Sequence, residues 1–215
     1  MDSATPKQYL SLAGQPLIAH TIARIAEVPG IAAVVVVTAP DDRWWPEVRA
    51  GLKHPVLEAA GGAARCDSVL NGLAALRNLA ADDDWVLVHD AARPCVRRED
   101  IERLMKEPGP HDCGGLLAVP LTDTVKRDDG RDHVAVTIDR SGMWRALTPQ
   151  MFRIAALESA LRGARASGVA VTDEAQAMER TGAMPRLVRG DADNIKVTTP
   201  ADLRLAELYL RIQAQ

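Results

Sequence analysis

The sequence predicts an α/β fold in which a mostly parallel sheet is flanked by helices. Two observations support this fold class: short runs rich in β-branched residues recur between turn residues, and the stretches between these runs carry apolar residues at helical spacing. Strands that alternate with helices are typical of parallel βαβ units. The chain has 215 residues, 47% of them hydrophobic, which is enough for one large core, so we expect residues 1–215 to form a single domain.

Each expected element has its own signal in the sequence. Strands are expected at residues 31–38, 85–89, 115–119 and 195–198, and helices with one apolar face at residues 17–25, 69–76 and 203–210. Pro16 is typical of a first helical position. Thr172, followed by Asp173 and Glu174, places a capping hydroxyl and two carboxylates at the positive end of a further helix, and Thr199 starts the last helix in the same way.

Residues 121–147 break the alternation of strands and helices. Residues 122–126 and 133–138 are predicted to form two short strands around a turn at residues 128–130, and such a hairpin would project from the sheet as an arm. A lone hairpin is marginally stable in water. We therefore expect this β-arm to pack against a second subunit, which predicts a homodimer.

The bulk composition excludes several classes of protein. A formal net charge of -3 gives no general attraction to nucleic acid or to an anionic membrane. Three cysteines without a C-x-x-C spacing support neither a disulfide framework nor a zinc site, and no apolar run approaches the roughly 20 residues of a membrane span. We expect a cytoplasmic protein with reduced thiols.

Two lysines are candidates for neutralising phosphate charge. Lys7 follows Pro6 ahead of the first helix, and a lysine is a mobile point charge that suits a polyphosphate. Taken alone, it is weak evidence, because such a lysine is more typical of a solvated surface position. Lys196 lies in the apolar segment 195–198, where its charge is costly unless it faces a cleft or a carboxylate.

Two turns that follow expected strands are further candidates. Gly61 and Gly62, followed by Ser68 at the start of a helix, are typical either of a turn that cradles a base or phosphate or of an ordinary turn with a capping residue. Asp90 and Arg93 follow the strand at 85–89, where open α/β sheets bind their ligands, and Asp90 can hold Mg²⁺ or a ribose hydroxyl. The alternative for Asp90 is a helix cap beside a surface arginine.

The predicted arm also carries polar groups that suit a phosphomonoester. Thr124 and Lys126 lie on its first strand, and Arg140 and Thr148 follow its second strand. An arginine offers a bidentate fork to phosphate oxygens. The same residues are compatible with an ordinary charged hairpin.

Seven motifs in this order resemble the 2-C-methyl-D-erythritol 4-phosphate cytidylyltransferases of bacterial non-mevalonate isoprenoid synthesis. They are PKQY, GG-x-x-R-x-DSV-x-x-GL, VLVHDAARP, DT-x-KR, DR-x-G-x-W-x-x-LTPQ, TDEA and DNIKVT. The resemblance covers the chain from Pro6 onward. It implies a Rossmann-like nucleotidyltransferase fold, a homodimer that exchanges β-arms, and Mg²⁺-dependent attack of the substrate phosphate on the α-phosphorus of CTP.

The resemblance also implies roles for particular residues. Lys7 and Lys196 would stabilise the α-phosphate region in the transition state, and Asp90 would also touch the metal. The cytidine and its ribose would be held by Gly61, Gly62, Ser68, Asp90 and Ala91. The methylerythritol phosphate would be bound by Arg93, Thr124, Arg140, Thr148 and Thr172, with Thr124 and Arg140 reaching the pocket of the other subunit.

The chain departs from the family pattern at its beginning. The family carries an apolar strand and a loop of the type A-A-G-x-G-x-R-M before PKQ, and Met1 corresponds to the closing Met of that loop. The explanations are a wrongly assigned start, omitted residues or a real loss, of which we expect one of the first two. We therefore assign the activity to the complete gene product and expect the 215 residues alone to bind CTP poorly.

Two other functions compete with this hypothesis. Ribitol-5-phosphate cytidylyltransferases share the fold, the CTP site and much of the PKQ and DAARP pattern, but the DR-x-G-x-W-x-x-LTPQ stretch favours methylerythritol phosphate. The other alternative is an inactive binding or scaffold protein that lacks its phosphate loop.

Overall fold

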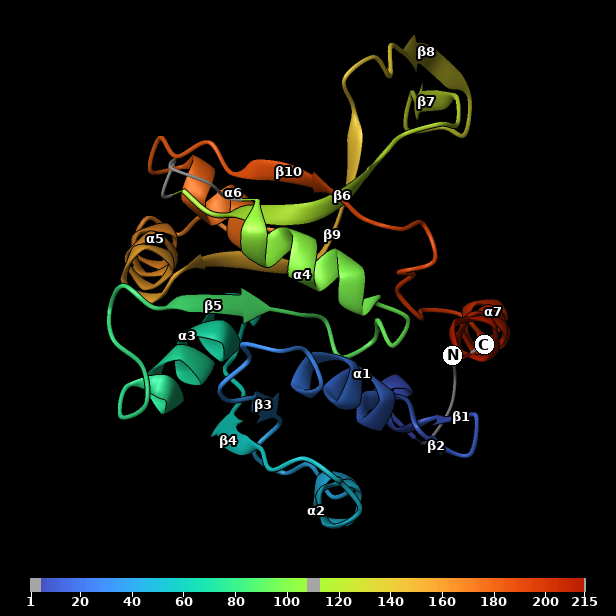
Figure 1. The fold of residues 1–215 in the computed structure, drawn as a ribbon. Coiled ribbons are helices and arrows are strands. Elements are labelled where there is room, and N and C mark those ends of the chain that lie inside the picture. The colour runs from blue at the N-terminus through green and yellow to red at the C-terminus, as the bar shows by residue number, and fades with distance from the viewer. Residues whose placement is uncertain (1–4, 108–112, 215) are drawn as a thin grey trace.

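A four-stranded sheet with helices on both faces forms the centre of the protein (Figure 1). The computed structural model describes residues 5–107 and 113–214. The strand order is β10-β6-β9-β5, with β5 at Trp85–Val88, β6 at Gly115–Pro120, β9 at Trp144–Arg153 and β10 at Arg186–Arg189. Because β9 is antiparallel to both of its neighbours and β10 is parallel to β6, the strands β5, β6 and β10 share one direction. The predicted α/β class is confirmed.

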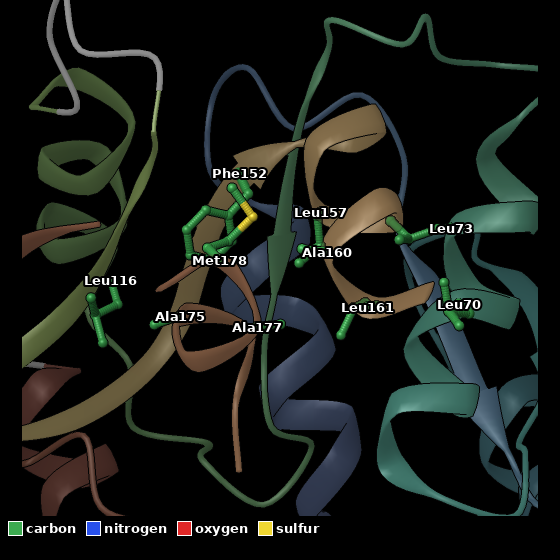
Figure 2. Close-up of a cluster of buried hydrophobic side chains, with 10 residues drawn as sticks. All are labelled: Leu70, Leu73, Leu116, Phe152, Leu157, Ala160, Leu161, Ala175, Ala177 and Met178. Carbon is green, nitrogen blue, oxygen red and sulfur yellow. The ribbon is translucent and has the colours of Figure 1, made fainter. Parts of the chain in front are cut away.

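The helices pack on this sheet through two apolar clusters. Their bounds are α1 Leu17–Ala26, α2 Trp45–Ala50, α3 Arg65–Leu76, α4 Arg98–Lys106, α5 Ile154–Ala166, α6 Glu174–Glu179 and α7 Pro200–Gln213. On one face, α3, α5 and α6 surround Leu116 and Phe152 (Figure 2). On the other face, α4 covers Leu117 and Met151. Adjacent residues of β6 and β9 thus point into opposite clusters, as successive strand residues must.

A smaller parallel pair lies beside the main sheet. It consists of β3 (Val35–Thr38) and β4 (Leu57–Ala60) and packs against α3. Within the described residues, β3 is hydrogen-bonded only to β4, and β5 only to β9. A short 3-10 helix at Lys7–Tyr9 and the pair β1 (Ser11–Leu12) and β2 (Gln15–Pro16) precede α1. Met1 lies outside the described residues.

The predicted hairpin is present between β6 and β9. Strands β7 (Val125–Asp128) and β8 (Val134–Ile138) pair with each other in a separate two-stranded sheet. The hairpin projects beyond the end of the main sheet (Figure 1). Its strand β8 exposes Val134 and Val136, at 64% and 44%.

Three details of the sequence prediction are wrong. Residues 195–198 form no strand: they are extended, and the Val197 N–H donates to the Ala92 carbonyl at 2.8 Å. The cap of α6 is Asp173, which accepts the Gln176 N–H, and not Thr172. Thr124 precedes β7 instead of lying within it. The capping box of α7 at Thr199, in contrast, is confirmed.

None of the helices in the ranges 5–107 and 113–214 combines the length and the apolar character that crossing a membrane requires.

Candidate active site

A cleft of about 270 Å³ opens where β3 and β5 end. Its lining includes Lys7 and Tyr9 of the 3-10 helix, residues 38–39 at the end of β3, residues 90–92 after β5, and Lys196. These segments are far apart in the sequence. They meet because the carboxyl ends of strands gather at one edge of an α/β fold, where ligands bind. The structure thus brings together Lys7, Asp90, Ala91 and Lys196.

Asp90 is surrounded by three cations in this cleft. Its Oδ2 lies 3.0 Å from Lys196 Nζ and 3.3 Å from Arg93 Nε, and its Oδ1 lies 3.9 Å from an Arg65 nitrogen. Burial raises the pKa of the Asp90 carboxyl, but Lys196, followed by Arg93 and Arg65, outweighs burial and holds the pKa below its usual value. Asp90 is therefore ionised at neutral pH.

Lys7 is placed by contacts of its short helix. Tyr9, two residues later, donates its hydroxyl to Asp42 Oδ2 at 2.6 Å, and Asp42 Oδ1 accepts the N–H groups of Trp44 and Trp45. Burial, with Asp42 adding to it, raises the pKa of Tyr9. These bonds join the segment of Lys7 to the segment that follows β3.

Thr148 and His89 support the backbone of Asp90 from behind. The Thr148 hydroxyl accepts the Asp90 N–H at 3.1 Å and is bonded to His89 Nδ1 at 3.0 Å, while His89 Nε2 lies 3.0 Å from the Arg93 carbonyl. Burial lowers the pKa of His89 to about 4, so the ring is neutral and donates through Nε2. The His89 ring thus bonds to the Thr148 hydroxyl and the Arg93 carbonyl, whereas the Asp90 carboxylate bonds to the side chains of Lys196 and Arg93.

An irregularity of β9 presents Thr148 at this position. Leu116 pairs with Gln150 and Ala118 with Ala146, so β6 advances two residues while β9 advances four. Such bulges are common beside active sites, where they redirect a side chain. The extra residues of β9 include Thr148.

The glycine turn packs closely on α3. Gly62 donates its N–H to Ser68 Oγ at 3.0 Å, and a Cβ on Gly62 would lie 2.2 Å from the Asp67 Cβ, so only glycine fits. The helix is capped at Ala64, whose N–H binds Asp67. Gly61, Gly62 and Ser68 thus form one unit, which lies outside the lining of the cleft.

The expected acceptor residues fall into two groups. Arg93 and Thr148 contact Asp90, and Arg93 also donates to the Asn194 carbonyl at 2.8 Å. Thr124 and Arg140 flank the hairpin, where Arg140 donates to the Thr122 carbonyl. Thr172 lies ahead of α6, and its N–H donates to Gln176 Oε1. The structure therefore does not gather all five in one pocket.

The donor set fits a metal ion only in part. Within residues 5–107 and 113–214, no three His, Cys, Asp or Glu side chains are placed to bind one metal. Mg²⁺, however, is commonly held by one or two carboxylates together with substrate phosphates and water. The ionised Asp90 in the cleft meets that requirement.

Comparison with known proteins decides the family. The family model described as 2-C-methyl-D-erythritol 4-phosphate cytidylyltransferase matches residues 1–212. The chain belongs to this family. Among the cytidylyltransferases of that name, the protein of Pseudomonas aeruginosa is 53% identical over 204 residues, which cover 94% of this chain and 87% of the relative. That of Hahella chejuensis is 48% identical over 211 residues, which cover 98% and 88%.

Solved structures of the cytidylyltransferases agree with this fold. A 4-diphosphocytidyl-2C-methyl-D-erythritol synthase superposes with a TM-score of 0.87 at 38% identity, covering 95% of both chains. The cytidylyltransferase of Francisella tularensis gives a TM-score of 0.83 at 34% identity, covering 95% of this chain and 93% of that one.

Two charged residues lie beside the cleft of this cytidylyltransferase that the sequence does not predict to belong to its site. Arg65 binds both carboxylate oxygens of Glu174, at 2.5 and 2.9 Å, and the Glu174 side chain is fully buried. The partners lie 109 residues apart, so no local pattern links them. The buried charge of Glu174 is visible only in the folded chain.

Proposed function

We infer that this chain transfers the cytidylyl group of CTP to 2-C-methyl-D-erythritol 4-phosphate, releasing pyrophosphate, in the synthesis of isoprenoid precursors. The observation that carries this inference is the cleft in which Lys7, Lys196 and the ionised Asp90 meet, in a chain of the cytidylyltransferase family. Two lysines and a carboxylate at the end of a sheet suit a nucleotide and its metal.

The reaction requires one phosphate anion to attack another. Such an attack depends on charge neutralisation and in-line positioning more than on proton transfer. We propose that Lys7 and Lys196 contact the oxygens of the α-phosphate, where negative charge is redistributed in the transition state. Mg²⁺ bound at Asp90 would neutralise further phosphate charge.

We propose that the remaining residues orient the two substrates. Asp90 and Ala91 would contact the cytidine ribose, and the unit of Gly61, Gly62 and Ser68 would hold the base. Arg93 and Thr148, which contact Asp90, would lie at the border between the nucleotide and the acceptor. Thr124, Arg140 and Thr172 would complete the site for the acceptor phosphate.

An assay of pyrophosphate release tests the reaction. The protein is incubated with CTP, Mg²⁺ and either methylerythritol phosphate or ribitol 5-phosphate. Faster release with methylerythritol phosphate is expected. Faster release with ribitol 5-phosphate would show that ribitol 5-phosphate is the acceptor. No release with either acceptor would favour the hypothesis of an inactive binding protein.

We also propose a homodimer in which each hairpin reaches the partner's site. The exposed Val134 and Val136 support this arrangement, because apolar side chains on a projecting hairpin gain from being covered. It would place Thr124 and Arg140 beside the acceptor pocket of the other subunit.

Mixing two inactive variants tests the exchange of arms. Arg140→Met and Lys196→Met subunits are unfolded together and refolded as a mixture. If arms are exchanged, a mixed dimer has one site with both wild-type residues, and about a quarter of the wild-type activity returns. If each subunit uses its own Arg140, every site carries one defect and no activity returns.

We propose further that residues 1–215 form one nucleotidyltransferase domain and that the protein works in the cytoplasm. The two clusters that share the central sheet support a single domain. Three free thiols, at Cys66, Cys95 and Cys113, support a reducing compartment.

A further inference from the structure

Glu174 carries a negative charge in the protein interior. It is the first residue of α6, its exposed fraction is 0%, and it adjoins the apolar cluster that contains Ala175, Ala177 and Met178. Its carboxylate receives both hydrogen bonds from Arg65. A buried ion pair is often no more stabilising than apolar side chains of the same shape. Its contribution to stability therefore does not explain why this position is charged.

The backbone around Glu174 is fixed on both sides. The buried Gln150 of β9 accepts the Ala175 N–H at 2.7 Å and donates to Asp173 Oδ2 at 3.0 Å. Asp173 in turn caps α6 through the Gln176 N–H at 2.8 Å. The Glu174 carboxylate is consequently held at a fixed place relative to β9.

Arg65 connects the fixed carboxylate of Glu174 with Asp90 in the cleft. Its guanidinium is half-exposed, and one of the nitrogens bound to Glu174 also lies 3.9 Å from Asp90 Oδ1. The other oxygen of Asp90, Oδ2, is occupied by Lys196 and Arg93. Arg65 therefore faces Oδ1, the oxygen of Asp90 that neither Lys196 nor Arg93 binds, at a distance that attracts the carboxylate without a close hydrogen bond.

We propose that Glu174, acting through Arg65, is a positioning residue that sets the orientation of the Asp90 carboxylate. This inference rests on the proposed function, because it assigns its effect to Asp90 in the nucleotide site. Thr148 fixes the backbone of Asp90, and Lys196 and Arg93 hold its Oδ2. The pair of Arg65 and Glu174 acts on the other oxygen, Oδ1, and so sets the rotation of the carboxylate. The bidentate geometry matters, because only a guanidinium fork binds both oxygens of Glu174 and still faces Asp90.

The Glu174→Gln substitution tests this role with little change of shape. Residues that hold a ligand-binding group in place commonly contribute 10- to 100-fold to activity, so we expect kcat/KM for CTP to fall about tenfold. Arg65→Lys, which keeps the charge but loses the fork, should cause a similar fall. Arg65→Lys also serves as the test of the proposal if the Glu174→Gln variant does not fold.

A double-substitution cycle separates positioning from a general structural role. If Glu174 acts through Asp90, then Glu174→Gln should cause no further loss in an Asp90→Asn background. An equal fold-loss in both backgrounds, or wild-type activity of Glu174→Gln, would overturn the proposal. Glu158→Gln is the matched control: it breaks another arginine–glutamate pair, with Arg77 directly after α3, and should retain wild-type activity.

Crystal structures of the wild-type protein and Glu174→Gln give a readout that needs no substrate. The Asp90 carboxylate should rotate away from its present contacts with Lys196 and Arg93. An unchanged orientation would contradict the proposal even if activity is lost. Failure of the wild-type protein to release pyrophosphate would instead reject the proposed function, and the two structures would still decide on the positioning role.

Discussion

Replacing Lys196 by methionine removes one charge from the cleft and keeps most of the side-chain stem. At the 3.0 Å that separates Lys196 Nζ from Asp90 Oδ2, two unit charges interact by about 5.5 kcal/mol at an effective dielectric constant near 20. This is an upper figure, because the Lys196 side chain is 44% exposed and solvent screens it.

A single contact with developing charge commonly contributes about 3–4 kcal/mol, so we expect kcat to fall about 10²- to 10³-fold. Pyrophosphate release under saturating CTP and acceptor measures this fall. Stability should change by less than about 1 kcal/mol, because the lysine of this ion pair is half-exposed and screened by solvent. Lys196→Arg, which keeps the charge, should lose less. A kcat of Lys196→Met within threefold of wild type would refute the assignment of Lys196 to the transition state.

Three further substitutions test the support of the cleft and the core. Thr148→Val leaves the Asp90 N–H and His89 Nδ1 unpaired and should lower the free energy of unfolding by about 1–3 kcal/mol in urea titrations, whereas Thr148→Ser should restore it. Phe152→Ala empties a fully buried position and should cost about 3–5 kcal/mol in the same titrations; a loss below 1 kcal/mol would contradict the packing described. The unfolded chain protonates His89 near pH 6.5 and the folded chain only near pH 4, so stability should fall by about 3 kcal/mol as the pH drops between these values. His89→Gln should lack this part of the pH dependence, and equal pH slopes for the two proteins would reject the assigned pKa.

The sequence predicts those parts of the site that follow from the fold class. Asp90 and Ala91 come directly after a predicted strand, and the carboxyl end of a strand is where α/β proteins bind ligands. Lys196 was expected to face a cleft or a carboxylate because of its apolar neighbours, and it lies 3.0 Å from Asp90. Local patterns suffice for such residues.

Other features depend on packing between distant segments. Ile195 and Val197 are apolar because they pack beneath α7, where Val197 is fully buried, and not because they pair in a sheet. Strand β9 contains Pro149, which argues against a strand within the sheet. The edge strand β10 is only four residues long and begins and ends with an arginine, so its apolar signal is weak. The contact of Arg65 with Glu174 joins segments that carry no mutual signal in the sequence.

The irregular pairing of β9 has a consequence for how this protein changes during evolution. The carboxyl half of β9 pairs with β5 and fixes the pocket, while its amino half, beginning at Trp144, pairs with β6 at the base of the hairpin. The extra residues between the two halves can absorb a shift in register, which in a regular strand would turn every side chain to the opposite face. The hairpin can therefore vary in length and sequence while Thr148 and Gln150 keep their places, so that the hairpin and the site can diverge separately although one strand connects them.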